Sequence, residues 1–321
     1  MCLYPKLIKN KKYIMNKKNN GIIPEMKDER AMYVPVGCGK CIECMKQKKR
    51  NWQVRLLEDI KVNKNAYFIT LTFTDQNLID LRKVIKFKSM KVDIDNEIAK
   101  VGVRRWLERI RKRSGKSCRH WLVTELGHNN TEGIHLHGLI WTDDINRAMI
   151  EWSKLYGITY VGKFVSEITV NYIVKYINKM DLDHKGYKPI VLTSSGIGKN
   201  YIGTFNSNRN KFKGIDTKES YKLNTGNEIS MPSYYRNKIY TDEERELLWM
   251  QMLDKEERFV LGQKIDISEN EDDYNRTLEE AREKNKRLGY GDDSAEWSFE
   301  EYQIKREKFR ALNKYSKERF K

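Results

Sequence analysis

The chain has 321 residues, of which 39% are hydrophobic and 33% are charged, with only 19 Gly and 5 Pro. This is the composition of a folded, very polar protein, and it excludes collagen-like and low-complexity chains. No apolar run reaches the ~18 residues that a membrane span needs, and the N-terminus lacks the apolar stretch of a secretory signal. We therefore expect the protein to remain in the compartment where it is made.

The charge of the chain is strongly positive and unevenly placed. The 62 Lys and Arg residues outnumber the 45 Asp and Glu residues, which gives a net charge of +17. Residues 241–321 hold more acidic than basic side chains, so the excess lies in residues 1–240. A domain this basic usually faces a polyanion, and no basic amphipathic helix with an apolar aromatic face indicates a membrane anchor. The charge favours nucleic acid as the partner, although a solvated lysine-rich surface would give the same composition.

The pattern of apolar residues predicts an α+β domain. Two strands separated by a short turn indicate an antiparallel sheet on which helices pack. We expect an irregular basic arm over residues 1–35, the main domain over 36–240, and a charged helical extension over 241–321. Within the main domain the predicted elements are a helix over 46–63, a strand over 67–74, a polar connection over 75–96, a basic amphipathic helix over 97–113, strands over 119–126 and 134–141, a helix capped by Asp143 or Asp144, a strand over 158–166, and a helix from Thr169 to about Met180.

Two histidines on the second strand of the pair are candidate metal ligands. His135 and His137 are two residues apart, so on a strand they point to the same face. Pairing of Leu126 with Ile134 across the turn would place Glu125 opposite the first histidine, with the Cβ atoms ~5 Å apart. Two imidazoles and a carboxylate suit Mn²⁺ or Mg²⁺. A slip of one residue would move the carboxylate to the other face, and two solvent-facing histidines are the plainer interpretation.

The helix that follows carries two tyrosines and two lysines at matching spacing. Tyr172 and Tyr176 are one turn apart and so are neighbours on one face, and Lys175 and Lys179 share the adjoining face. A phenol has a pKa of ~10, and nearby lysine charges favour its ionised form. Attack of a tyrosine on a phosphodiester leaves a phosphotyrosine link and a free hydroxyl. An ordinary amphipathic helix with half-buried tyrosines is the alternative.

The five cysteines are an odd number, as expected in a reducing compartment without a full disulfide framework. Cys38, Cys41 and Cys44 form two Cys-x-x-Cys steps in series, whereas Cys2 and Cys118 stand apart. A structural zinc site needs four ligands. Cys118 or a distant histidine could supply the fourth, and a buried turn of thiols without metal is the alternative.

A glycine-rich segment and a basic helix are candidate contacts to phosphate. Asn200 follows the lysine of the Gly196-Ile-Gly198-Lys199 segment, and the first glycine of the ATP-binding P-loop pattern is missing, so no ATPase or helicase activity is expected. Strand separation would need a host helicase. The candidate contacts to the DNA backbone, for which plain solvation is the alternative, are Arg104, Arg105, Arg109, Arg111 and Lys199.

These motifs together resemble a known superfamily. FITLTFT over residues 68–74, the His-Leu-His triplet and the tyrosine–lysine helix stand in the order of the three motifs of HUH endonucleases, which initiate rolling-circle replication. The tyrosine spacing resembles that of the replication initiators of microviruses, phages with small circular single-stranded DNA. The segments CGKCIECMKQKKRNWQVR, KFVSEITVNYIVKYINKM, SSGIGKNYI and MPSYYRNKIY are similar to the gokushovirus branch, and the resemblance covers about residues 36–245.

The resemblance implies both a fold and a reaction. The fold is an HUH or RRM-like palm, a five-stranded antiparallel sheet with the histidines at its centre and the tyrosine helix beside it. One tyrosine nicks the origin strand and keeps the 5′-phosphate, the free 3′-hydroxyl primes synthesis, and the other tyrosine takes part in rejoining the circle. The implied roles are Tyr172 and Tyr176 as nucleophiles, His135, His137 and Glu125 as ligands of Mg²⁺ or Mn²⁺, and Lys175 and Lys179 as phosphate-stabilising cations.

The implied partners are single-stranded or supercoiled phage DNA at the origin and the helicase and polymerase of a bacterial host, in whose cytoplasm the protein would act. No membrane partner is expected. Two alternatives stay open. One is a non-catalytic protein that binds single strands by stacking bases on the aromatic side chains of an RRM-like sheet. The other is a relaxase or transposase of the same superfamily.

Overall fold

The structure is a computed structural model that describes residues 2–85, 93–127, 133–162, 164–179, 184 and 187–292. The chain divides into two compact units. Residues 1–51 together with 201–294 form the first unit, and residues 52–200 belong to the second. The predicted region boundaries after residues 35 and 240 do not coincide with this division. Among the described residues, no helix is both long enough and apolar enough to cross a membrane.

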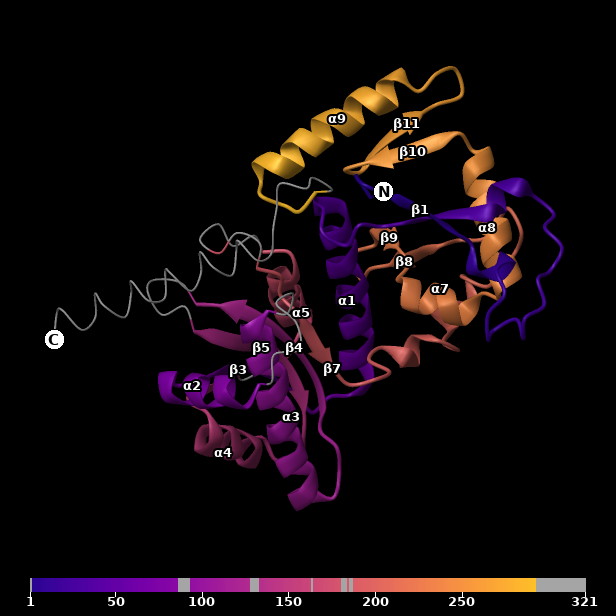
Figure 1. The fold of residues 1–321 in the computed structure, drawn as a ribbon. Coiled ribbons are helices and arrows are strands. Elements are labelled where there is room, and N and C mark those ends of the chain that lie inside the picture. Colours follow the sequence, from indigo (N-terminus) through magenta and orange to yellow (C-terminus); the bar gives the residue numbers. More distant parts are fainter. Residues whose placement is uncertain are drawn as a thin grey trace. The chain divides into compact units, whose positions relative to one another are not determined.

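The second unit is built on a five-stranded antiparallel sheet, as predicted. The strand order is β6-β3-β5-β4-β7, which places the strand of the two histidines, β5, at the centre (Figure 1). The elements are α1 (Ile42–Val62), which crosses the boundary between the units, β3 (Ala66–Thr72), α2 (Asp75–Val84), α3 (Ile94–Ser114), β4 (Arg119–Leu126), β5 (Ile134–Trp141), α4 (Ile145–Leu155), β6 (Thr159–Gly162), α5 (Glu167–Ile173), the 3₁₀ helix η3 (Val174–Ile177) and β7 (Val191–Thr193).

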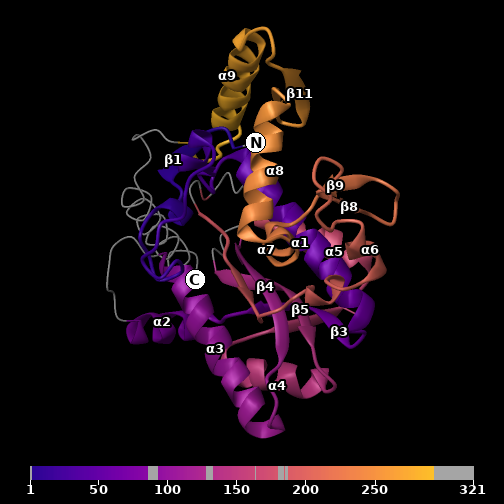
Figure 2. The ribbon, with the colours of Figure 1, turned by 90° about the vertical axis from the view of Figure 1, so that its right-hand side faces the viewer.

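The two faces of this sheet differ in the side chains and helices that they carry. One face packs on α3 and α4, which Figures 1 and 2 show on the same side of the strands. The largest side chains of this core, Trp106 and Trp152, are fully buried, and the indole nitrogen of Trp106 donates to the carbonyl oxygen of Ala148 at 2.8 Å. The opposite face carries His135 and His137, because alternate residues of β5 point to opposite sides.

The central strands approach each other very closely at one glycine. A Cβ atom at Gly138 would lie 2.0 Å from the carbonyl oxygen of Trp121 on β4. Only glycine fits there, so the residue between His137 and Leu139 is constrained by the pairing of β4 with β5. The pairing itself follows the predicted register, with Leu126 opposite Ile134.

Three predicted elements need correction. The polar connection expected over 75–96 contains α2 and the start of α3; Thr74 caps α2, with its side chain accepting from the backbone of Asn77. The helix expected from Thr169 begins at Glu167 instead, because Ser166 is the N-cap and Thr169 completes its capping box. Its last turn, η3, has the tighter 3₁₀ form that is common at helix ends. The strand expected over 158–166 is shorter, and the predicted turn between β4 and β5 falls largely on residues 128–132, outside the described residues.

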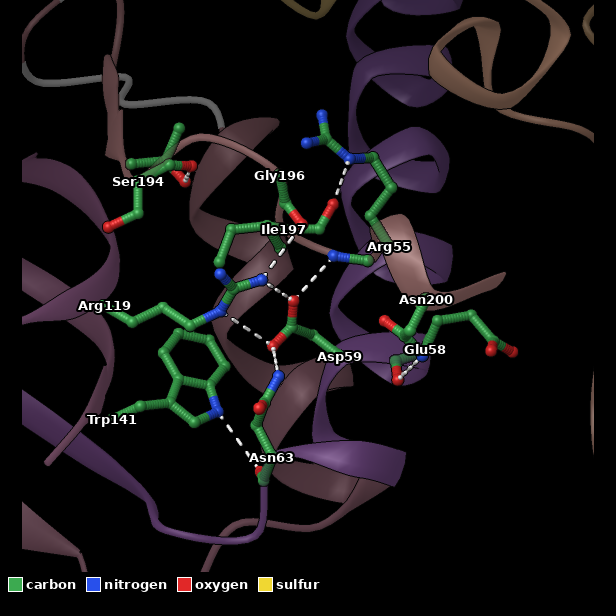
Figure 3. A network of polar contacts seen from close by, with 12 residues as sticks. Arg55, Glu58, Asp59, Asn63, Arg119, Trp141, Ser194, Gly196, Ile197 and Asn200 are labelled. Atoms are coloured by element: carbon green, nitrogen blue, oxygen red, sulfur yellow. Dashed lines mark hydrogen bonds and ion pairs between the residues drawn. The ribbon is translucent and has the colours of Figure 1, made fainter. Parts of the chain in front are cut away.

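A buried ion pair ties the loop after β7 to α1 and β4 (Figure 3). Asp59 of α1 is fully buried, and both of its oxygens accept from the guanidinium of Arg119. The backbone nitrogen of Gly198 also donates to Asp59, at 2.6 Å, and Arg119 donates to the carbonyl oxygen of Gly196 at 3.0 Å. The amide of Gly198 is therefore engaged within the protein.

The first unit is made of small strand pairs and short helices. The N-terminal arm is more regular than predicted, since β1 pairs with β2. The C-terminal extension contains the predicted helices α8 and α9, but a hairpin, β10–β11, lies between them, and α9 lies beside this hairpin in Figures 1 and 2. The helix expected after residue 292 lies outside the described residues. The remaining elements are β1 (Lys6–Lys9), η1 (Lys11–Tyr13), η2 (Glu29–Met32), β2 (Tyr33–Val36), η4 (Lys199–Tyr201), α6 (Phe205–Asn208), β8 (Ser220–Lys222), β9 (Glu228–Ser230), α7 (Ser233–Ile239), α8 (Asp242–Asp254), β10 (Glu257–Val260), β11 (Gln263–Asp266) and α9 (Asp272–Arg287).

Candidate active site

Three side chains with metal-ligand chemistry meet on the central strands. His135 and His137 lie on β5, and Glu125 of β4 lies directly opposite the first of them. Nε2 of His137 is 2.9 Å from Oε2 of Glu125, and Nε2 of His135 is 3.5 Å from the same oxygen. One ligand atom from each side chain lies within 4.8 Å of the other two. The structure thus brings the three candidate ligands together, at the register that the sequence suggested.

The other ring nitrogen of each histidine is held by the protein. Nδ1 of His135 donates to the carbonyl oxygen of Gly133 at 3.1 Å, and Nδ1 of His137 lies 3.0 Å from Oγ1 of Thr70 on β3. Because a carbonyl can only accept, Nδ1 of His135 is the donor to Gly133, and Nε2 is the ring atom that faces Glu125. Outer contacts of this kind orient imidazoles that bind metals. The donor set therefore fits a divalent cation.

The two predicted nucleophiles lie against this set. Tyr172 is in the last turn of α5 and Tyr176 is in η3, and their hydroxyl oxygens are 2.7 Å apart. The ring of Tyr176 stacks on the imidazole of His137, with centroids 4.3 Å apart and planes within 8°. Tyr172 is 48% exposed and packs edge-on against Phe68 of β3. The ring of Tyr176 is therefore in direct contact with one candidate ligand, and the hydroxyl of Tyr172 is bonded to that of Tyr176.

Lys179 pairs with the second oxygen of Glu125. Its Nζ atom is 2.5 Å from Oε1. Burial acts to raise the pKa of Glu125, but hydrogen bonds from His135, His137 and Lys179 outweigh it and hold that pKa well below its usual range. The carboxylate is therefore ionised at neutral pH, as a metal ligand must be. Lys175 and Lys179 are both exposed, and their predicted role on phosphate stays a prediction.

Tyr176 does not have the lowered pKa that the neighbouring lysines were expected to produce. Burial, the hydrogen bond with Tyr172 and the negative charge of Glu125 raise the pKa of Tyr176. The charge of Lys179 is already paired with Glu125, which explains why it does not favour the phenolate. The Tyr176 phenol is therefore protonated at neutral pH, and any attack by it requires transfer of its proton.

Four of the five basic residues proposed to contact DNA lie away from this site. The four arginines are exposed on α3, the helix that packs on the other face of the sheet. One of them approaches a buried carboxylate, since Nη1 of Arg109 is 3.9 Å from Oε2 of Glu151. Lys199 is exposed at the start of η4. The structure therefore does not bring Arg104, Arg105, Arg109 or Arg111 together with the histidines and tyrosines.

Sequence reasoning missed several neighbours of the candidate site. Thr70 was not among the predicted site residues, although its place opposite His137 follows from the register. Phe68 and Tyr160 were not singled out, although alternation along β3 puts Phe68 on the same face as Thr70. Cys2 was set apart from the other cysteines, yet its sulfur lies among those of the Cys-x-x-Cys steps, whereas Cys118 donates to the carbonyl oxygen of Trp141 in the other unit.

A comparison with protein families finds a match over part of the chain. Residues 66–181 match the model of a family of replication-associated proteins, the ORF2 type. The matched segment begins at β3 and contains both histidines, Glu125 and both tyrosines, and the match is consistent with a replication initiator. No curated protein and no solved structure gives a match to the chain.

Proposed function

We propose that the protein is a replication initiator that nicks and rejoins single-stranded DNA through a tyrosine, as in the rolling-circle replication of a small circular phage genome. One observation carries the proposal: two tyrosine hydroxyls 2.7 Å apart lie beside a His-His-Glu set on one face of the sheet. Neither the tyrosine pair nor the His-His-Glu set alone would be specific for this function. Together they supply a nucleophile and a place to bind the scissile phosphate. The match over residues 66–181 supports the same class of function.

The candidate ligands would hold one Mg²⁺ or Mn²⁺ ion. The cation would be bound by Nε2 of His135, Nε2 of His137 and a carboxylate oxygen of Glu125, whose mixed nitrogen and oxygen donors suit such ions. A divalent cation there supplies Lewis-acid polarisation of the phosphodiester. Thr70 and the carbonyl of Gly133 keep the two rings in the orientation that binding needs.

The tyrosines exchange one phosphoester for another. The attacking phenol oxygen forms a bond to phosphorus, the bond from phosphorus to the 3′ oxygen breaks, and the phenol loses its proton while the 3′ oxygen gains one. The products are a 5′-phosphotyrosine link and a free 3′-hydroxyl that can prime synthesis. Rejoining reverses these changes with a 3′-hydroxyl as the nucleophile, so no external energy source is needed.

Tyr176 is the first nucleophile in this proposal. It stacks on His137, whereas Tyr172 lies further from the ligands and is 48% exposed. The hydrogen bond between the two hydroxyls gives the proton of Tyr176 a route through Tyr172 to solvent. Tyr172 then remains available to cleave the regenerated junction after one round of synthesis.

Aromatic side chains near the site suit a single-stranded substrate. Tyr160 of β6 is opposite Thr70 and therefore on the same face as His137, and it is 61% exposed. Phe68 contacts both Tyr160 and Tyr172, with ring centroids 6.3 and 6.1 Å apart. Bases of a single strand stack on such rings without regard to sequence. This row of rings also favours the second candidate function, a protein that binds single strands without cleaving them.

A covalent adduct separates the two functions. The test compares the wild-type protein with Tyr176→Phe, Tyr172→Phe and the double variant. Each would be incubated with Mn²⁺ and a pool of single-stranded oligonucleotides, each of which contains a randomised segment. We expect a DNA–protein band that survives denaturing electrophoresis for the wild type, a much weaker band for Tyr176→Phe, and none for the double variant. Phenylalanine keeps the packing and removes only the hydroxyl. Binding of the pool without any adduct, in Mn²⁺ or in Mg²⁺, would leave only the non-catalytic function.

A further inference from the structure

The first unit contains a cluster of four thiols that the proposed nicking reaction does not use. The sulfur atoms of this thiol cluster lie within 4.8 Å of one another, and the members are Cys2, Cys38, Cys41 and Cys44. Two of the separations are 3.9 Å, between Cys2 and Cys41 and between Cys38 and Cys44. The fourth thiol comes from the second residue of the chain, 36 positions before the next member, and not from Cys118.

The spacing of the sulfurs fits a single tetrahedral metal ion. Four thiolates about 2.3 Å from one zinc ion lie about 3.8 Å from each other. A disulfide would need two sulfurs only about 2 Å apart, and a cluster of several iron atoms would hold its sulfurs further from one another than one ion does. All four thiols are free of disulfides. The geometry therefore points to a mononuclear site with four sulfur ligands, which is the common form of structural zinc.

The backbone around the thiol cluster is shaped to converge the sulfurs. Gly39 has a φ of +76°, which lets the chain turn sharply between Cys38 and Cys41. The amide of Cys41 donates to the sulfur of Cys38 at 3.3 Å, and the amide of Cys38 donates to that of Cys2 at 3.2 Å. A Cβ atom at Gly37 would lie 3.1 Å from the sulfur of Cys44, so the approach of the chain there favours a residue without a side chain.

The thiol cluster is embedded in a small apolar core of the first unit. Cys41 is fully buried, and the core around it combines Leu3 from the N-terminus with Ile42 from the start of α1 and with Val260 and Ile265 from the C-terminal hairpin. The amide of Ile42 also donates to the side chain of Asn285 on α9. A metal here would join the N-terminal residues to the start of α1, where a core of this size alone gives little stability.

We propose that the thiol cluster binds one structural Zn²⁺ ion, with Cys2 as the fourth ligand. The ion is closed off from substrate by its four protein ligands, and its effect is on folding of the first unit. The proposal is independent of the nicking reaction, since no residue of the thiol cluster lies in the unit that carries the tyrosines.

The test uses the full chain with His135→Ala and His137→Ala, so that the candidate active site contributes no metal. We expect about one zinc ion per purified chain by mass spectrometry of the metal content. Replacement of zinc by Co²⁺ should give the thiolate charge-transfer band and the intense visible bands of a tetrahedral sulfur site. Cys2→Ser should weaken zinc binding by more than the roughly 10- to 100-fold that loss of an outer contact costs. Cys118→Ser is the matched control and should bind as the parent does.

A second variant keeps the test decisive if Cys2→Ser does not fold. Cys2→His retains a zinc ligand, so it should keep stoichiometric zinc and shift the cobalt bands toward those of a site with three sulfurs and one nitrogen. A parent chain that binds neither zinc nor cobalt would overturn the proposal. So would stoichiometric iron in place of zinc, or a loss of zinc in Cys118→Ser equal to that in Cys2→Ser.

Discussion

The two groups of candidate metal ligands in this chain are built in opposite ways. The thiol cluster has four sulfur ligands and lies inside an apolar core. Its member Cys41 is fully buried. The His-His-Glu set has three ligands of mixed chemistry on one face of the sheet, with two tyrosines beside it. Four protein ligands leave no position for substrate, whereas three leave positions for water or phosphate. The difference assigns a structural role to the first group and a chemical role to the second.

The surroundings of the two groups point the same way. The sheet that carries His135 and His137 has its own large core on the opposite face and the buried pair of Asp59 with Arg119, so it does not need a metal to fold. The thiol cluster lies in a unit of short strands and a small core. Whether a set of metal ligands has a structural or a chemical role is therefore best decided together with the stability of the structure that holds it.

Loss of a histidine ligand should separate chemistry from folding. We expect His137→Ala to lower the nicking rate at least about 100-fold, because Lewis-acid stabilisation is worth several kcal/mol. Zinc content and the circular dichroism spectrum should be unchanged. Nicking by His137→Ala at a rate close to that of the wild type would show that the His-His-Glu set has no part in the chemistry.

The buried ion pair, in contrast, should matter for stability. Asp59→Ala removes the carboxylate that accepts from the guanidinium of Arg119 and the amide of Gly198, and removal of one partner of a buried pair costs about 3–5 kcal/mol. Urea denaturation measures this loss of unfolding free energy. The matched control is Asp80→Ala, which breaks an exposed pair with Lys83 and should have no measurable effect. Equal stability of the two variants would contradict the structural role of Asp59.

The aromatic rings of Phe68 and Tyr160, beside the His-His-Glu set, should contribute to the binding of single-stranded DNA. Tyr160→Ala should weaken the binding of single-stranded DNA by about 1–3 kcal/mol, the usual value of one base stacked on an aromatic ring, which is about 5- to 150-fold in Kd. Tyr160→Phe keeps the ring and should bind like the wild type. Fluorescence anisotropy with an oligonucleotide measures both. Equal losses in the two variants would mean that the hydroxyl, and not stacking, makes the contact.

A third histidine on the same sheet should show the smallest effect. His120 faces the core with α3, and burial lowers its pKa, although a hydrogen bond with the carbonyl oxygen of Cys118 opposes this. Its folded pKa is below the unfolded value of ~6.5, so the unfolded chain takes up the proton first and stability is lost as the pH falls below ~6.5. His120→Gln should therefore flatten the dependence of stability on pH between about 5 and 6.5. An unchanged slope would mean that His120 does not titrate in this range.

The sequence predicted the His-His-Glu set much better than the thiol cluster. The positions of Glu125 and His135 follow from alternation along two strands joined by a short turn, which is local information. Cys2 lies in a segment without apolar periodicity, and its contact with Cys38 depends on tertiary structure alone. The apolar stripe of α3 predicted that the helix packs on the sheet, but not on which face, so its arginines could not be placed relative to the histidines.

The most direct test of the central claim is to locate the DNA on the protein. Adduct formed with single-stranded DNA and Mn²⁺ would be digested with nuclease and protease, and the modified peptide would be sequenced by mass spectrometry. We expect a nucleotide attached through its 5′-phosphate to Tyr176 in the wild type, and to Tyr172 after one round of transfer. A nucleotide on a residue outside this pair, or a nicked product with no attached peptide, would contradict it.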